Sequence, residues 1–275
     1  MKTQAFLFLI CLFAGATMVS CQKDHSQSKT DGPKIADAVL AQIKAKGFST
    51  SNVHAVNGGY LVEGDIFLSD KDLAKKGGVN TKVRVAKTEQ YSTNNLVNGL
   101  PRTITVKVVN LGSAFVQGTD LAIQRYNALG LRLQFQRITS GTADITIQGF
   151  NQGPSGGYIT LGSSGFPDDY GNPYYLVQMN TNSAAYGSNP NVYYVGSVIQ
   201  HEIGHCIGMR HTDYMDRSYS CGGDPIDEGD GGVGAVWIDG TPSGPDANSW
   251  MLACSNGGNR TFNSNDIIAL NYLYQ

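Results

Sequence analysis

The chain has 275 residues, a net charge of −2 and a hydrophobic content of 41%, which is enough for one large domain or for a domain with a small additional unit. No basic stripe that could neutralise phosphates is visible, which argues against nucleic acid as a partner. No internal repeat or coiled-coil heptad is present, and no second apolar run is long enough to cross a membrane.

The first twenty residues have the pattern of a signal peptide. A positively charged start precedes an apolar run at 5–16, which is too short for a comfortable membrane span and is followed by small residues. Residues 18–21 (MVSC) resemble the bacterial lipobox, in which cleavage leaves a lipidated cysteine at the new N-terminus. The resemblance implies a signal peptide at 1–20, lipid attachment at Cys21 and a polar tether at 21–32.

The predicted location follows from this lipobox. We expect a bacterial cell-envelope lipoprotein, with the outer membrane as the expected site, that is held at the membrane by its N-terminal lipid. Methionine at the first lipobox position departs from the usual leucine, so ordinary cleavage and secretion are the alternative. We expect a monomer.

Residues 33–95 are predicted to form a small separate unit with a linker. Apolar spacing at 35–43 favours a helix, and 60–68 is strand-like. The polar segment 88–98 is typical of an exposed linker that a protease can cleave.

Residues 96–275 are predicted to form the main domain. Its first part alternates strand and helix patterns, and a helix at 115–129 is stopped by Gly130. Asn189 and Pro190 suit the start of a later helix, because asparagine caps helices and proline fits the first helical position. The expected strands are 103–108, 133–138, 144–148, 158–161 and 175–179.

The sequence HEIGHCIGMRHTD, which begins at His201, places three histidines in the spacing of a metal site. On a helix, residues four apart project from one face, so His201 and His205 can share a metal ion. Gly208 can adopt the left-handed conformation that ends a helix, which would bring His211 back as a third ligand. Three protein ligands leave one coordination position open, as in catalytic zinc sites.

The carboxylate of Glu202 lies beside these histidines and is the candidate general base. Water in the open position of a zinc ion has its pKa lowered to roughly 7, and a neighbouring carboxylate can take its proton. Zinc also polarises a bound amide carbonyl. The pattern therefore predicts one catalytic zinc ion and hydrolysis of peptide bonds by a zinc-bound water that Glu202 activates.

This motif resembles that of the metzincin clan of zinc metallopeptidases, HExxHxxGxxH followed by a methionine-containing turn. The wording HEIGH is most similar to the bacterial dual-action HEIGH metallopeptidases. The resemblance extends to residues 249–251 (SWM), where Met251 would lie beneath the zinc, and to a closing helix around 265–270. It implies an α+β fold with a twisted, mixed five-stranded sheet, two long helices above the cleft, and an irregular lower subdomain. It also implies that 158–161 is the antiparallel edge strand, where an extended substrate would pair.

The chain departs from several metzincin families after this turn. They carry a tyrosine two residues after the methionine, where this chain has Ala253. Tyr214 is a candidate replacement. Asp213 is a second-shell candidate that would orient a ligand imidazole or hold a neighbouring loop, and the alternative is a surface turn residue.

Three cysteines remain after Cys21, and an export route favours oxidation. Cys221 and Cys254 bracket a glycine-rich stretch and are the favoured disulfide pair, although the spacing also allows Cys206 as a partner. A buried apolar position is the expected role of Cys206. Calcium could bind the oxygen-rich loop that follows Asp213, although a solvated loop is favoured there; its acidic residues are Asp224, Asp227, Glu228 and Asp230.

We interpret residues 33–95 as a pro-region that covers the cleft until it is removed. Matrix-type metzincins use a cysteine for this purpose, but the chain has none between 21 and 206, so Asp65 or Glu63 is the candidate. The leading hypothesis is an exported zinc endopeptidase that acts on proteins or peptides. The alternative is a structural or binding lipoprotein that holds zinc without turnover, which Glu202 disfavours because a structural site needs no base.

Overall fold

The computed structural model describes residues 34–75, 90–155, 157–229, 232, 234–242 and 244–275. The predicted signal peptide, Cys21 and most of the predicted tether therefore lie outside the described residues, as does Asp230. In the part of the chain that is described, no helix is both long and apolar enough to cross a bilayer.

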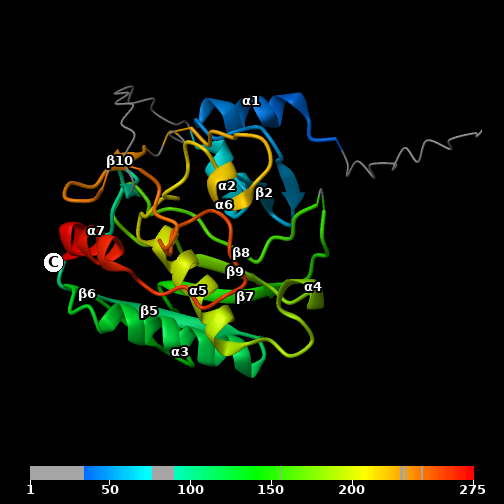
Figure 1. Cartoon of the computed structure of the whole chain (residues 1–275). Helices are drawn as coiled ribbons and strands as arrows, with labels where there is room; N and C mark the ends of the chain where they lie inside the picture. The colour runs from blue at the N-terminus through cyan, green and yellow to red at the C-terminus, as the bar shows by residue number, and fades with distance from the viewer. Residues whose placement is uncertain (1–33, 76–89, 156, 230–231, 233, 243) are drawn as a thin grey trace, which may run out of the picture. The chain divides into compact units, whose positions relative to one another are not determined.

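A five-stranded mixed sheet carries much of the buried core (Figure 1). The strand order is β6-β5-β7-β9-β8, in which β8 alone runs antiparallel to its neighbour. Together with the helices, this sheet confirms the predicted mixed α+β class. The strands are β5 (Arg102–Val109), β6 (Leu133–Arg137), β7 (Ile145–Phe150), β8 (Gly162–Ser163) and β9 (Leu176–Asn180).

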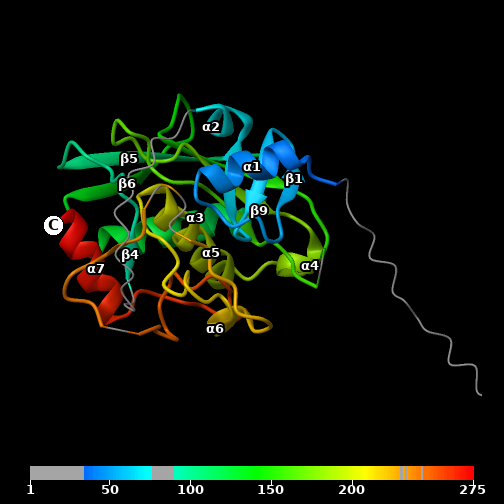
Figure 2. The same cartoon turned by 90° about the horizontal axis from the view of Figure 1, so that it is seen from above.

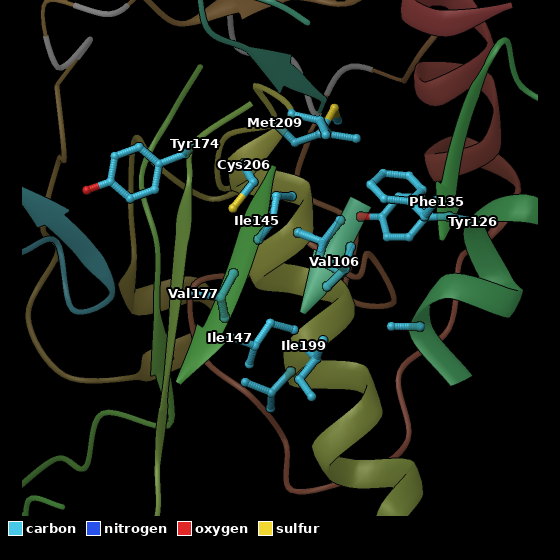
Figure 3. Packing of buried hydrophobic residues seen from close by; sticks show 14 of the residues in the cluster. Val106, Tyr126, Phe135, Ile145, Ile147, Tyr174, Val177, Ile199, Cys206 and Met209 are labelled. Atoms are coloured by element: carbon cyan, nitrogen blue, oxygen red, sulfur yellow. The ribbon is translucent and has the colours of Figure 1, made fainter. Parts of the chain in front are cut away.

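Two long helices, α3 (Ser113–Asn127) and α5 (Val192–Cys206), lie side by side and contact the sheet (Figures 1 and 2). They approach closely because glycines meet at the crossing, where a Cβ on Gly118 would lie 3.0 Å from the backbone nitrogen of Gly196. The apolar face of α5 packs on side chains of β5, β7 and β9, which fixes α5 in position (Figure 3).

The N-terminal unit contains a three-stranded antiparallel sheet and two short helices with a small core of their own. Leu61 and Phe67 of this unit belong to the main hydrophobic core instead, so the unit is packed into the rest of the protein. Its elements are α1 (Asp37–Ala45), β1 (His54–Val56), β2 (Gly59–Val62), β3 (Ile66–Ser69) and α2 (Asp70–Ala74).

The single strand expected at 60–68 is a hairpin. Strands β2 and β3 pair with each other as far as Val62 and Ile66, and the three residues between these two positions form the turn. Glu63 and Gly64 have φ angles of 52° and 89°, which a continuing strand does not adopt. The turn projects Asp65 away from the hairpin's own small core.

Two further expectations are corrected in position. The active-site helix begins at Val192, because Asn191 rather than Asn189 caps it and accepts hydrogen bonds from the Tyr193 and Tyr194 amides. The antiparallel edge strand is the short β8, four residues later than expected; within 158–161, the Leu161 carbonyl accepts from the Asn180 amide of β9 at 2.9 Å.

The exposed linker expected at 88–98 is also corrected, in so far as it is described. Residues 90–93 are buried, and β4 (Tyr91–Ser92) pairs with β10 (Val236–Trp237). The side-chain amide nitrogen of Gln90 finds partners inside the protein, since it donates to Asp266 and Ser249. Polarity alone therefore misled the prediction. The remaining helices are α4 (Ser183–Tyr186), α6 (Ser218–Cys221) and the expected closing helix α7 (Ser264–Tyr274).

Candidate metal centre

The three histidines of the motif converge through their Nε2 atoms. His205 Nε2 lies 3.1 Å from His201 Nε2 and 3.2 Å from His211 Nε2. His201 and His205 stand one turn apart on α5, and His211 returns after the helix has ended. Gly208, with a φ of 104°, permits this reversal of the chain.

The opposite ring nitrogen of each histidine is bonded to an acceptor. Nδ1 of His201 lies 2.9 Å from the Trp250 carbonyl oxygen, and Nδ1 of His205 lies 2.8 Å from that of Met209. Nδ1 of His211 lies 2.9 and 3.0 Å from the two carboxylate oxygens of Glu228. Because these partners only accept, each Nδ1 donates its proton to them, which leaves Nε2 as the atom of each ring that can bind a metal ion.

A fourth ligand atom comes from the N-terminal unit. Asp65 Oδ2 lies 3.1 Å from His211 Nε2 and 3.4 Å from His201 Nε2. The four ligand atoms lie within 4.8 Å of one another, and all four residues are buried. Asp65 therefore completes a His₃Asp cluster that can hold a metal ion.

Four of the six distances between these ligand atoms suit a bound metal ion, and the remaining two are within 4.8 Å. Ligand bonds of about 2.0–2.1 Å give tetrahedral edges of about 3.3 Å, and the four ligand distances named above lie between 3.1 and 3.4 Å. Three inward lone pairs and a carboxylate would repel one another without a positive charge between them. The donor set thus fits zinc, which favours imidazole nitrogen and carboxylate oxygen.

Glu202 lies beside the cluster and is 1% exposed. Ser164 Oγ donates to its Oε2 at 2.8 Å. A Cβ on Gly162 would lie 2.7 Å from Oε1, so the edge strand leaves room for this carboxylate. Glu202 and His201 also line one cavity of about 180 Å³, which places a buried carboxylate next to the metal centre and to space for a ligand.

The pKa shifts in the cluster follow from its burial and from the charges that its members exert on one another. Burial raises the pKa of Glu202, and the charge of Asp65 raises it further. Burial alone would raise the pKa of Asp65, but the neighbouring His211 and His201 hold it well below its usual range. Burial lowers the pKa of His205, and the two other imidazoles lower it further. A divalent cation would favour ionised carboxylates and neutral imidazoles here.

The predicted methionine turn lies under the site. Met251 is fully buried, and its sulfur would lie 2.6 Å from a Cβ on Gly204, between the two histidines of α5. The Met251 carbonyl accepts from the Thr212 amide at 2.9 Å. Since Trp250 also binds His201, this turn supports the helical histidines and the returning chain together.

Asp213 and Tyr214 do not contact the imidazoles. The Asp213 carboxylate accepts from Ser220 Oγ at 2.5 Å and from the Ala253 amide at 2.9 Å, so it joins two loops. Tyr214 packs edge-on against Tyr91, away from the cavity, and does not replace the missing tyrosine. The residue that orients His211 is Glu228, which the sequence analysis placed in an oxygen-rich, solvated loop.

The cysteines pair as the sequence favours. Cys221 and Cys254 form a disulfide with an S–S distance of 2.09 Å, and Cys206 is free and fully buried. In the oxygen-rich loop, Asp224 and Asp227 are exposed, whereas Glu228 is turned inward. Calcium binding by this loop stays a prediction.

Comparisons with known proteins agree with this site. A family model described as "Dual-action HEIGH metallo-peptidase" matches residues 61–274. Two solved structures of myroilysin resemble the chain at 15% identity. The match to one of them has a TM-score of 0.42 and covers 67% of this chain and 98% of that myroilysin chain. The match to the other has a TM-score of 0.40 and covers 71% of this chain and 94% of that myroilysin chain. No curated protein matches the chain.

Proposed function

Because the chain belongs to the dual-action HEIGH metallopeptidase family, we propose that it is the latent form of a zinc-dependent endopeptidase with a metzincin-like catalytic domain. The observation that carries this proposal is the convergence of three Nε2 atoms beside the buried carboxylate of Glu202. A bound zinc ion would act as a Lewis acid toward the scissile carbonyl and toward the attacking water.

The residues of this chain divide the remaining work. His201, His205 and His211 would hold the metal ion, and their Nδ1 partners fix the ring orientations. Glu202 is placed to take a proton from the attacking water and to pass it to the leaving amine. Its raised pKa suits a group that must hold that proton in between.

Asp65 makes this form latent, because its carboxylate takes the fourth ligand position that substrate or water would need. The segment around Asp65 also pairs with the edge of the sheet: the Phe67 amide donates to the Ser164 carbonyl at 2.7 Å, and the Ser164 amide donates to the Asp65 carbonyl at 3.0 Å. An extended substrate would use these same backbone groups. Substrate and the docked segment therefore compete for this edge, and loss of the Asp65 ligand shifts that competition toward substrate.

Two arginines hold this turn in place. Arg217 donates to the Glu63 carbonyl, and Arg210 forms a buried ion pair of 3.2 Å with the Glu63 carboxylate. Full activation requires that these contacts break, together with the pairing at Ser164. Cleavage within or after residues 33–95 followed by release of that unit is the simplest route.

The closed coordination of this site supports the alternative of a zinc protein without turnover, since structural sites are normally filled by four protein ligands. The two functions differ in one test. Full chain with Asp65→Ala, loaded with zinc, should cleave quenched peptides, and the double variant Asp65→Ala with Glu202→Gln should not. Removal of metal by a chelator should abolish cleavage, and zinc should restore it. Zinc binding without cleavage by the Asp65→Ala chain, before and after limited proteolysis of its N-terminal unit, would establish the alternative.

We also propose that the protein is exported and lipidated at Cys21. The N-terminal sequence pattern and the disulfide between Cys221 and Cys254, which needs an oxidising compartment, support this proposal. Mass spectrometry of the membrane fraction should find an acylated N-terminal cysteine. A soluble product that begins at another residue would instead favour secretion.

A further inference from the structure

The cavity beside the metal centre contains one cation that has no acidic partner. Arg260 lines this cavity together with His201 and Glu202. Its guanidinium donates to the Cys254 carbonyl at 3.2 Å. No ion pair among the described residues includes Arg260. A guanidinium has five N–H donors, so most of them are available to a ligand.

The two acidic residues whose charges act on Arg260 are hydrogen-bonded to other groups. Asp213 and Asp266 both affect the pKa of Arg260, which burial lowers. The carboxylate of Asp213 is held by Ser220 and Ala253. That of Asp266 accepts from four donors, namely Gln90, Ser249, Trp250 and Asn263. Neither is free to turn toward the cavity.

Arg260 is supported by a well-anchored segment. Cys254 is fixed by the disulfide, the Gly258 carbonyl accepts from Ser197 Oγ at 3.2 Å, and Asn259 Oδ1 accepts from Arg125 at 2.6 Å. Ser197 stands one helical turn before His201, a separation of roughly 6 Å along the axis. The segment is therefore held against α5 one helical turn before His201.

Apolar side chains also line this cavity. Val198, Trp250 and Leu252 line it and are almost fully buried. Apolar walls reduce the screening of a charge at the end of a pocket, so a carboxylate that reaches Arg260 gains a strong, charge-assisted contact. Arg217, the other arginine of the cavity, is already paired with Glu228 at 3.3 Å.

We propose that Arg260 forms a subsite for a substrate carboxylate beside the scissile bond, so that the peptidase prefers peptides with an acidic residue at one fixed position. This inference rests on the proposed function. The carboxylate can belong to an internal aspartate or glutamate, or to a free C-terminus.

The test compares cleavage of matched peptides by the full chain that carries Asp65→Ala. A peptide library analysed by mass spectrometry should show aspartate or glutamate enriched at one position next to the cut. For a matched pair with glutamate or glutamine there, kcat/KM should favour glutamate by about 10-fold to 100-fold. Arg260→Gln should remove this preference, and Arg260→Glu should reverse it toward lysine and arginine. Arg132→Gln, an exposed arginine outside the cavity, is the control.

Amidated and free-acid peptides separate the two sources of the carboxylate. Preference that persists in amidated peptides assigns the subsite to a side chain, and preference that disappears assigns it to the C-terminus. Cleavage without acidic preference, or a preference that Arg260→Gln leaves unchanged, overturns the subsite and leaves the peptidase intact.

Binding provides a measurement that does not need turnover. In the chain with Asp65→Ala and Glu202→Gln, calorimetry should give a Kd at least tenfold lower for the glutamate peptide than for the glutamine peptide. Arg260→Gln should abolish that ratio. Equal affinities overturn the subsite, whereas selective binding without cleavage by the Asp65→Ala chain contradicts the proposed function alone.

Discussion

Glu228 binds the Nδ1 atom of His211 with both carboxylate oxygens, at 2.9 and 3.0 Å and at a sequence separation of 17. The same carboxylate lies 3.3 Å from Arg217 and 3.7 Å from Arg210. One buried acid thus orients a metal ligand and neutralises the two arginines that hold the Glu63 turn.

Replacing Glu228 should weaken metal binding. Loss of an outer-shell carboxylate typically lowers metal affinity 10-fold to 100-fold, because the ligand imidazole loses its fixed orientation and part of its basicity. We expect Glu228→Gln to show this loss in a competition titration with a chromophoric chelator. Asp224→Asn, at an exposed position of the same loop, is the matched control and should bind zinc like the unaltered chain. Equal affinities for both variants would show that Glu228 is dispensable.

Replacing Gly64 should loosen the latent form. A Cβ at this position would lie 2.7 Å from Arg217 Nη2, in a turn with a φ of 89°. Gly58→Ala is a matched control, because its φ is 81° but nothing lies within 4 Å of its Cβ. Both variants carry a backbone cost on the order of 1 kcal/mol. Of the two variants, only Gly64→Ala should raise the peptidase activity of the full chain. Equal activity of both would show that the turn at Gly64 does not maintain latency.

Asp266 should make stability depend on pH. Burial raises its pKa to about 6 from 3.8, in spite of its hydrogen bonds to Asn263, Ser249, Trp250 and Gln90. Its contribution is therefore fully present below about pH 3.8 and is lost as pH rises through about 6. Relative to Asp266→Asn, the unfolding free energy should fall by an amount on the order of 3 kcal/mol across that range. Urea titrations that give the same pH dependence of the unfolding free energy for the unaltered chain and for Asp266→Asn would contradict this assignment.

The disulfide between Cys221 and Cys254 should stabilise the lower half of the site. It closes a loop with a sequence separation of 33, for which the chain-entropy model gives about 3–4 kcal/mol. Urea unfolding of the Cys221→Ser, Cys254→Ser double variant should show a loss of this size. A reductant should destabilise the natural chain but not the double variant, and an effect on both would point to another cause.

The metal ligands could be predicted from the sequence because they depend on local geometry. Histidines four apart on a helix and a glycine at its end define their own arrangement, as the positions of His201, His205 and Gly208 show. Glu228 could not be found in this way, because a contact across a glycine-rich loop has no periodicity. The burial of Gln90 was missed for a related reason, since its partner Asp266 is 176 residues away.

The turn at Asp65 was predicted only in part. The missing cysteine pointed to a carboxylate, and the choice between Glu63 and Asp65 depended on a turn that the strand-like pattern of 60–68 concealed. In the structure, Asp65 faces the imidazoles and Glu63 faces Arg210. The side chains of Glu63 and Asp65 point to different partners around the turn, and only Asp65 reaches the imidazoles.

Anomalous diffraction at the zinc edge from crystals of the full, zinc-loaded chain tests the central claim most directly. The account predicts one strong peak, about 2.0–2.2 Å from Nε2 of His201, His205 and His211 and from Oδ2 of Asp65. A peak that lacks any of the three imidazoles, or no peak between them, would contradict it.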